Sequence, residues 1–199
     1  MSSTSFFKRI KDILGSAALE SLVADAANGL PSNTFMLLSR LLPLVNVELV
    51  IRNQQNEIAL LWRERSSDVA KAGWHLPGGI MRIGESIEER VLKTAKEECG
   101  IAVKGFYITS MSETVIDVDM PRRHFISFVI ECCEWSWLST AAHSEISFYY
   151  DSPRDLIENH RRYESLFGKP SPDEKTELIR DIAFERGFKI RQEMLGERK

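Results

Sequence analysis

Several features that mark other protein classes are scarce or missing in this sequence. Only three cysteines occur, Cys99, Cys132 and Cys133, and no two have the CxxC spacing. The sequence therefore predicts neither a disulfide framework nor a structural zinc site. No apolar run approaches the roughly 20 residues that cross a bilayer, and the N-terminus has no apolar signal-peptide core. These absences favour a cytoplasmic protein without a membrane partner.

Neither sign of charge dominates the chain. Lys and Arg number 26 against 29 Asp and Glu, a net charge of −3, so the overall charge does not favour nucleic acid as a partner. There is no GxSxG motif of a serine hydrolase, and "GKPS" at 168–171 lacks the earlier glycine of a phosphate loop. The 199 residues, 43% of them hydrophobic, are enough for one domain with appended segments.

The sequence does contain alternating strand and helix patterns. Strands are predicted at residues 44–52, 58–63, 103–117, 124–134 and 146–150. Helices are predicted at residues 5–27, 33–42, 86–99, 153–167 and 172–194. This order predicts a layered α/β architecture. We expect an N-terminal helical extension at 1–43, a central domain at 44–152 and a C-terminal helical extension at 153–199.

The central helix is rich in carboxylates and has clear ends. Ser86 followed by Glu89 is a capping-box pattern, so the helix is predicted to begin at Ser86. Gly100 can supply the left-handed residue that ends it. The predicted buried stripe comprises Ile87, Val91, Leu92, Ala95 and Cys99.

Glu97 and Glu98 stand side by side near the end of this helix. Like charges repel, and the C-terminal turn of a helix disfavours anions. A divalent cation would resolve this conflict, because Mg²⁺ prefers carboxylate and carbonyl oxygens, and the glycines before the helix let a backbone carbonyl approach the same ion. The alternative is a solvated acidic face screened by Lys93 and Lys96.

The spacing of these residues resembles the Nudix signature. Gly79 is followed by five residues, Glu85, seven residues and then the block "KTAKEECGI" at 93–101. The resemblance implies a Nudix-type α/β/α sandwich with a mixed sheet and hydrolysis of a nucleoside diphosphate linked to another group. It also implies Mg²⁺ or Mn²⁺ as the cofactor.

By this resemblance, the carbonyl of Gly78 and the carboxylates of Glu97 and Glu98 are metal ligands, and Glu98 is essential for catalysis. Glu85 is a salt-bridge partner of Lys93, while Gly79 and Gly100 are structural residues of the motif. The sequence departs from the signature twice. Lys93 replaces an arginine and loses its bidentate fork. Thr94 replaces a glutamate and cannot act as a base at neutral pH.

Other stretches between residues 33 and 167 resemble one branch of the family, the GDP-mannose mannosyl hydrolases, which break the sugar carbon–oxygen bond. The stretches are "FMLLSRLLPLVNVELVIRN", "GWHLPGG", "RRHFISFVIE", "HSEISFY" and "ENHRRYESLF". This resemblance implies a nucleotide-sugar substrate, with Glu48, Arg65 and His124 as substrate-binding residues. His143 would be the general base, since histidine titrates near neutrality.

The sequence departs from that branch at Ile80 and Phe125, so the sugar and the nucleobase of the substrate are left undecided. Ordinary cleavage of the pyrophosphate link is the second interpretation, and a catalytically silent module that binds a nucleotide is the third. The branch resemblance, together with the appended amphipathic helices, also predicts a homodimer.

Overall fold

The computed structural model describes residues 15–17, 20, 30–64, 72–115, 122–138 and 146–168. Apart from residues 15–17 and 20, which are helical, the helices predicted at 5–27 and 172–194 lie outside the described residues. Among the helices that are described, none has the length and apolar character needed to cross a membrane.

The described elements follow one another in an order close to the predicted one. They are α2 (Ser32–Leu38), β1 (Leu44–Ile51), β2 (Ile58–Arg63), β3 (Gly73–His75), β4 (Gly78–Ile80), α3 (Ile87–Cys99), β5 (Ile101–Val115), β6 (His124–Trp137), β7 (Ile146–Tyr149) and the 3-10 helix η2 (Glu158–Leu166).

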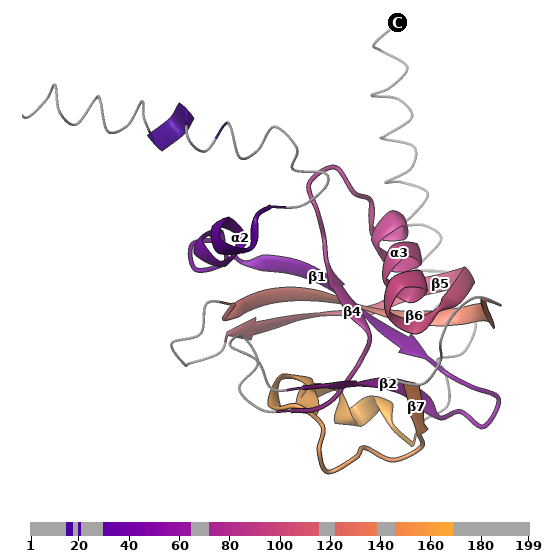
Figure 1. The fold of residues 1–199 in the computed structure, drawn as a ribbon. Helices are drawn as coiled ribbons and strands as arrows, with labels where there is room; N and C mark the ends of the chain where they lie inside the picture. The colour runs from indigo at the N-terminus through magenta and orange to yellow at the C-terminus, as the bar shows by residue number, and fades with distance from the viewer. Residues whose placement is uncertain are drawn as a thin grey trace, which may run out of the picture.

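The strands form two sheets. The first has the order β4-β1-β6-β5; β1 runs parallel to β6 and antiparallel to β4, and β5 is antiparallel to β6. The second is antiparallel, with the order β3-β2-β7. In Figure 1, α3 lies on one side of the first sheet and β2, β7 and η2 lie on the other. The predicted α/β class and mixed sheet are confirmed.

Strand β1 is buried on both faces because α3 covers one side of the first sheet and β2 and η2 cover the other (Figure 1). Val47, Leu49 and Ile51 pack with α3 in one apolar core. Val50 belongs to a second core with Leu60 of β2 and with residues from the C-terminal part of the described chain. Since side chains alternate along a strand, Asn46 and Glu48 point to the same side as Val50. A carboxylate is thus placed opposite the face that α3 covers.

Two short strands were not predicted. Strands β3 and β4 have three residues each and lie in the stretch "GWHLPGGI", for which no strand or helix was predicted. Three residues are too few to show an alternating pattern, and glycine and proline suggest a turn. These strands are specified by their hydrogen-bonded pairing with β2 and β1 and not by a pattern in the local sequence.

The helix predicted at 153–167 is a 3-10 helix over Glu158–Leu166. Buried residues spaced three apart are compatible with both an α-helix and a 3-10 helix. The pattern therefore predicts that a helix packs on the core but not which kind of helix it is. His160 and Tyr163, three residues apart, are both buried in the structure.

Both predicted ends of α3 are confirmed. Ser86 is the N-cap in a reciprocal capping box with Glu89, and Gly100 has a left-handed conformation with φ 64°. The prediction that Leu92 is buried is wrong, because this side chain is 39% exposed. Arg90 and Thr94 are buried instead, since the face of α3 against β4 is set by those two positions, one helical turn apart.

Candidate active site

Gly78 lies on β4, the edge strand of the first sheet. It is opposite Glu48 in the register. In the adjacent pair of residues, Leu49 and Pro77, the Leu49 N–H donates a hydrogen bond to the Pro77 carbonyl at 2.8 Å. Since bonded and non-bonded pairs alternate in antiparallel strands, the N–H and C=O of Gly78 point away from β1. The Gly78 N–H donates to Oε2 of Glu98 at 3.0 Å.

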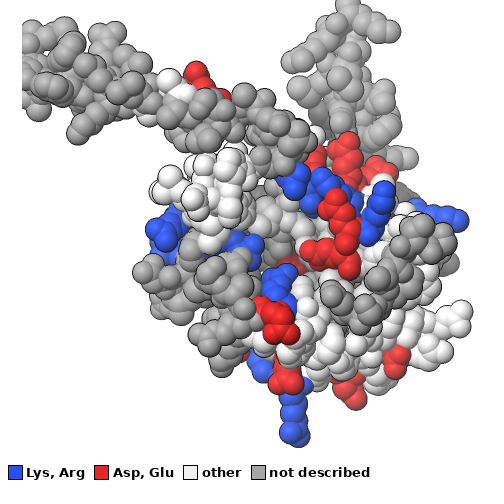
Figure 2. All heavy atoms as spheres, viewed as in Figure 1, with Lys and Arg blue, Asp and Glu red and all other residues white. Residues whose placement is uncertain are grey.

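Glu97 and Glu98 lie at the exposed end of α3. Although Glu98 as a whole is exposed, its carboxylate lies against the backbone of Gly78. Desolvation raises the pKa of Glu98, the Gly78 hydrogen bond and the Arg63 charge oppose this, and the Glu97 charge adds to it. Figure 2 shows acidic and basic side chains gathered together on this side of the molecule. The Glu98 carboxylate therefore lies at Gly78, and the charge of the neighbouring Glu97 acts on it.

A divalent cation fits the donor groups found here. Across the described ranges, no three His, Cys, Asp or Glu side chains converge into a complete metal site. Two carboxylates and a backbone carbonyl on the same edge would leave the remaining positions to water and phosphate oxygens, which is how Mg²⁺ is usually bound. Gly78, Glu97 and Glu98 are thus compatible with the predicted metal, which would neutralise charge on a phosphate group.

The two glycines allow close approach from opposite faces of β4. A Cβ on Gly78 would be 2.5 Å from Oε2 of Glu48, and a Cβ on Gly79 would collide with Oγ1 of Thr94 and lie 2.9 Å from Cδ of Arg90. Larger residues are therefore excluded for different reasons. The missing side chain at Gly79 leaves room for helix α3, and the missing side chain at Gly78 leaves room for the Glu48 carboxylate of β1.

Thr94 occupies the motif position where a glutamate was expected. Its side chain is buried at the contact with Gly79, and Oγ1 has no hydrogen-bond partner among the described residues. Helix α3 therefore offers no third carboxylate beside Glu97 and Glu98. A base that activates water has to come from another element or from the metal site itself.

Glu85 forms the predicted ion pair with Lys93, but its closer partner is Arg90, which was not predicted. The Arg90 guanidinium contacts both oxygens of Glu85, with Nε to Oε2 at 2.8 Å, whereas Nζ of Lys93 is 3.9 Å from Oε1. Desolvation tends to raise the pKa of Glu85, but the Arg90 bonds and the Arg82 N–H outweigh it, so this pKa is lowered. The planar guanidinium group that Lys93 lacks is thus supplied by Arg90, three residues earlier.

Glu48 is fully enclosed on the other side of β4. Burial raises its pKa to about 8, against the lowering effects of the Arg63 charge and the Asn46 hydrogen bond; the Glu98 charge raises it further. Nδ2 of Asn46 donates to Oε1 of Glu48 at 2.6 Å. The structure thus places Glu48 beside the Gly78–Glu98 contact, and its predicted role in binding substrate remains a prediction.

Sequence reasoning missed Arg63 and His160. The charge of Arg63, at the end of β2, lowers the pKa of Glu48, Glu98, His75 and His160. His160 packs edge-on against His75 at 5.9 Å. No local spacing marks either residue, because only the fold brings them to Glu48.

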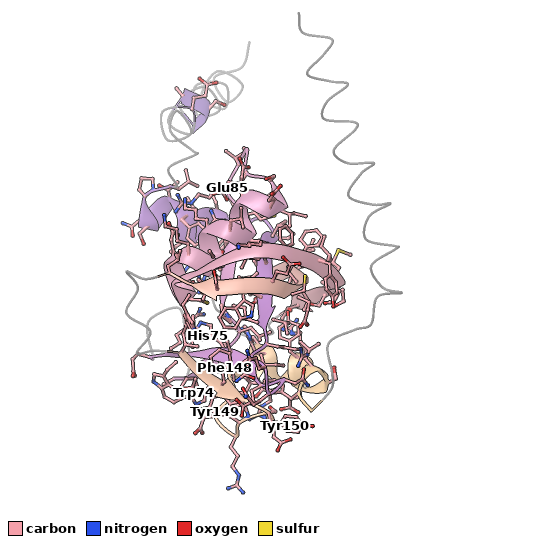
Figure 3. All side chains as sticks on the ribbon, turned by 90° about the vertical axis from the view of Figure 1, so that its right-hand side faces the viewer. Trp74, His75, Glu85, Phe148, Tyr149 and Tyr150 are labelled. Carbon is pink, nitrogen blue, oxygen red and sulfur yellow. The ribbon has the colours of Figure 1, made fainter. Side chains whose placement is uncertain are left out.

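His75 is buried, and desolvation lowers its pKa to about 3. Figure 3 shows it on the inner side of the β2 layer, with Trp74 and Tyr149 farther out; their rings are 5.2 Å apart. His75 is therefore a neutral residue of the interior.

One predicted residue, His124, is not joined to this cluster. His124 begins β6 and contacts Oε1 of Glu113 at 2.9 Å. It lies five residues along β6 from Val129, the partner of Glu48, which is about 16 Å at a strand rise of ~3.3 Å per residue. Arg65 and His143 lie outside the described residues. The substrate-binding roles of Arg65 and His124, and the catalytic role of His143, remain predictions.

A family model described as the NUDIX domain matches residues 42–167. The chain belongs to this family. The Nudix resemblance of the glycine loop and carboxylate helix is thereby confirmed, and members of this hydrolase family typically use a divalent metal.

Two curated relatives share part of the chain. An ADP-ribose pyrophosphatase of Methanocaldococcus jannaschii is 36% identical over 88 residues, which is 44% of this chain and 48% of the relative. An 8-oxo-dGTP diphosphatase of Escherichia coli is 32% identical over 89 residues, 45% of this chain and 60% of the relative. The chain thus spans about half the length of the curated relatives it matches. Neither relative supports the GDP-mannose mannosyl hydrolase branch.

A solved structure agrees with the fold. The crystal structure of a MutT NUDIX hydrolase from Burkholderia pseudomallei has a TM-score of 0.52 and 21% sequence identity, and the match covers 63% of this chain and 98% of that chain. At this identity the similarity concerns the fold alone.

Proposed function

We propose that this Nudix protein hydrolyses the pyrophosphate link of a nucleoside diphosphate derivative at a divalent-cation site formed by Gly78, Glu97 and Glu98. The observation that carries the proposal is the contact between the Glu98 carboxylate and the Gly78 N–H at 3.0 Å. It holds a charged helix end against the outward-facing backbone of β4, where a carbonyl and two carboxylates can share one cation.

The chemistry follows from these groups. A bound divalent cation would polarise a phosphoryl oxygen and neutralise the charge of the leaving group. Glu97 and Glu98 would hold it, and the Gly78 carbonyl would fix its distance from the sheet. Arg63 adds a positive charge that acts on both Glu48 and Glu98, which suits a substrate carrying phosphates.

The names of the two curated relatives suggest the first substrates to test. One is called an ADP-ribose pyrophosphatase and the other an 8-oxo-dGTP diphosphatase, so ADP-ribose and 8-oxo-dGTP should be compared with GDP-mannose in the presence of Mg²⁺. We expect turnover of at least one of the first two, with a nucleoside monophosphate among the products.

A Glu98→Gln variant tests the metal site, because it removes one charge at nearly constant shape. We expect loss of Mg²⁺-dependent turnover with an unchanged unfolding midpoint. Glu88→Gln, an exposed acidic residue in the first turn of the same helix, is the matched control and should remain active. Unchanged Mg²⁺ dependence in Glu98→Gln would refute the assignment.

The buried Thr94 favours a second candidate function. Because Thr94 leaves no third carboxylate beside Glu97 and Glu98, water could instead attack the sugar carbon of a nucleotide sugar such as GDP-mannose, with His143 as the base and a nucleoside diphosphate and free sugar as products. Hydrolysis in ¹⁸O-water separates the two reactions. Label in a phosphate product supports the first proposal, and label in the free sugar supports the second.

Assembly and domain limits are separate proposals. We propose a homodimer formed through the terminal helical extensions, with the catalytic domain at 44–152 as predicted. Light scattering at micromolar concentration should give about twice the 22.7 kDa chain mass; a mass near that of one chain would refute the dimer.

A further inference from the structure

The 3-10 helix η2 brings two buried polar side chains to the underside of the first sheet. His160 is 7% exposed and Tyr163 6% exposed. The hydroxyl of Tyr163 is 3.1 Å from Oγ of Ser112 on β5. Figure 1 shows η2 on the side of the first sheet opposite α3. Polar groups that are fully buried at this point need a reason, because an apolar side chain would pack there at lower cost.

Each nitrogen of His160 faces a different part of the site. Nδ1 accepts the backbone N–H of Leu76 at 3.1 Å, two residues before Gly78. Burial holds the pKa of His160 well below its usual range, so the ring is neutral. Because Nδ1 is an acceptor, the single ring proton is on Nε2, which lies 3.8 Å from Oε1 of Glu48.

The two oxygens of Glu48 are also distinguished. Oε1 accepts from Nδ2 of Asn46 at 2.6 Å, and Oδ1 of Asn46 accepts from Oγ of Ser127 at 2.7 Å. Oε2 lies over Gly78, where a Cβ would be 2.5 Å away. Asn46 therefore donates to one oxygen, with Nε2 of His160 3.8 Å from the same atom, and the other oxygen is directed toward the glycine that contacts Glu98.

We propose that His160 is a positioning residue of the hydrolytic site, which fixes the Leu76–Gly78 backbone through Nδ1 and orients the Glu48 carboxylate over Gly78 through Nε2–H. The inference rests on the proposed function, since Glu48 matters only if the reaction takes place beside Gly78. It assigns a functional role to a helix located about sixty residues after α3.

Two substitutions separate the roles of the two nitrogens. His160→Asn retains an acceptor near Nδ1 but removes the donor toward Glu48, whereas His160→Gln places an amide donor near Nε2. Loss of a partner that orients a functional group typically costs about 10–100-fold in activity. We expect kcat to fall by that factor in His160→Asn, with KM nearly unchanged, and to fall by a smaller factor in His160→Gln, which keeps the donor toward Glu48 but loses the acceptor of the Leu76 N–H.

A double-mutant cycle tests whether His160 acts through Glu48. If it does, adding His160→Asn to Glu48→Gln should lower kcat no further, because coupled residues are not additive. Additive effects, or equal losses in His160→Asn and His160→Gln, would overturn the proposal. Activity loss in Glu98→Gln combined with wild-type behaviour of both His160 variants would refute this inference and leave the proposed function standing.

The tautomer provides a test on the unmodified protein. Long-range ¹H–¹⁵N correlation spectra at pH 7 should show His160 neutral, with the proton on Nε2. A ring protonated at Nδ1 could not accept the Leu76 N–H, and observing it would overturn the proposal whether or not the variants fold.

Discussion

The two faces of β4 differ in how they contribute to the site. On the Gly79 face, α3 packs through Arg90 and Thr94, and all the contacts come from one continuous stretch of sequence. On the Gly78 face, Glu48 of β1 meets His160 of η2, residues 112 positions apart in the numbering. The first face is a local motif and the second exists only in the folded chain.

The faces also differ in electrostatics. Around α3, Glu85 is paired with Arg90 and its pKa is lowered. On the other face, burial dominates, and the pKa of Glu48 is raised to about 8. The helix face therefore favours a charged carboxylate, whereas the enclosed face favours a protonated one until a cation approaches.

The largest expected effect concerns the enclosed face. With metal removed by a chelator, Glu48 is protonated in the folded state up to about pH 8, while its unfolded value is 4.5. Stability from this group is fully present below pH 4.5 and is lost as pH rises through 8, by up to about 1.4 kcal/mol per pH unit. Denaturant titrations of wild type and Glu48→Gln should diverge over this range, and parallel curves would contradict the assignment.

The next effect concerns the ion pair on the helix face. Arg90→Met leaves the half-buried Glu85 without its main partner, and we expect a loss of about 3 kcal/mol in the free energy of unfolding. Lys93→Met is the matched control. Because Lys93 is 36% exposed and 3.9 Å from Glu85, its removal should cost less than about 1 kcal/mol. Equal losses measured by urea unfolding would restore Lys93 as the main partner.

The smallest effect compares the two glycines directly. Gly79→Ala forces a methyl group against the side chains of Thr94 and Arg90 on α3 and should cost about 1–3 kcal/mol, as overpacking does. Gly78→Ala mainly meets the end of the flexible Glu48 side chain, so it should impair turnover more than folding. Adding Thr94→Ala should recover part of the stability lost in Gly79→Ala and none of the activity lost in Gly78→Ala, as thermal unfolding and kinetic assays can show.

Much of the helix face could be predicted from the sequence. The capping box, the glycine end of α3 and the adjacent carboxylates are local patterns with local physical causes, and each was found where predicted. The choice of Arg90 over Lys93 was missed, because both residues can reach Glu85 from the same helix. Which one forms the closer pair depends on how α3 is rotated against β4.

The sequence by itself determined the family, the strands β1, β2, β5, β6 and β7 to within a few residues, and the carboxylate helix, because alternation, helical spacing and capping act over short distances. Only the tertiary structure decided that Glu48 lies over Gly78, that Arg63 adds its charge there, and that His160 reaches both. These relations depend on strand order and on the packing of η2. Because the groups are buried, their pKa values are shifted. No periodicity along the chain encodes them, since contacts between distant residues are fixed only when the sheet assembles.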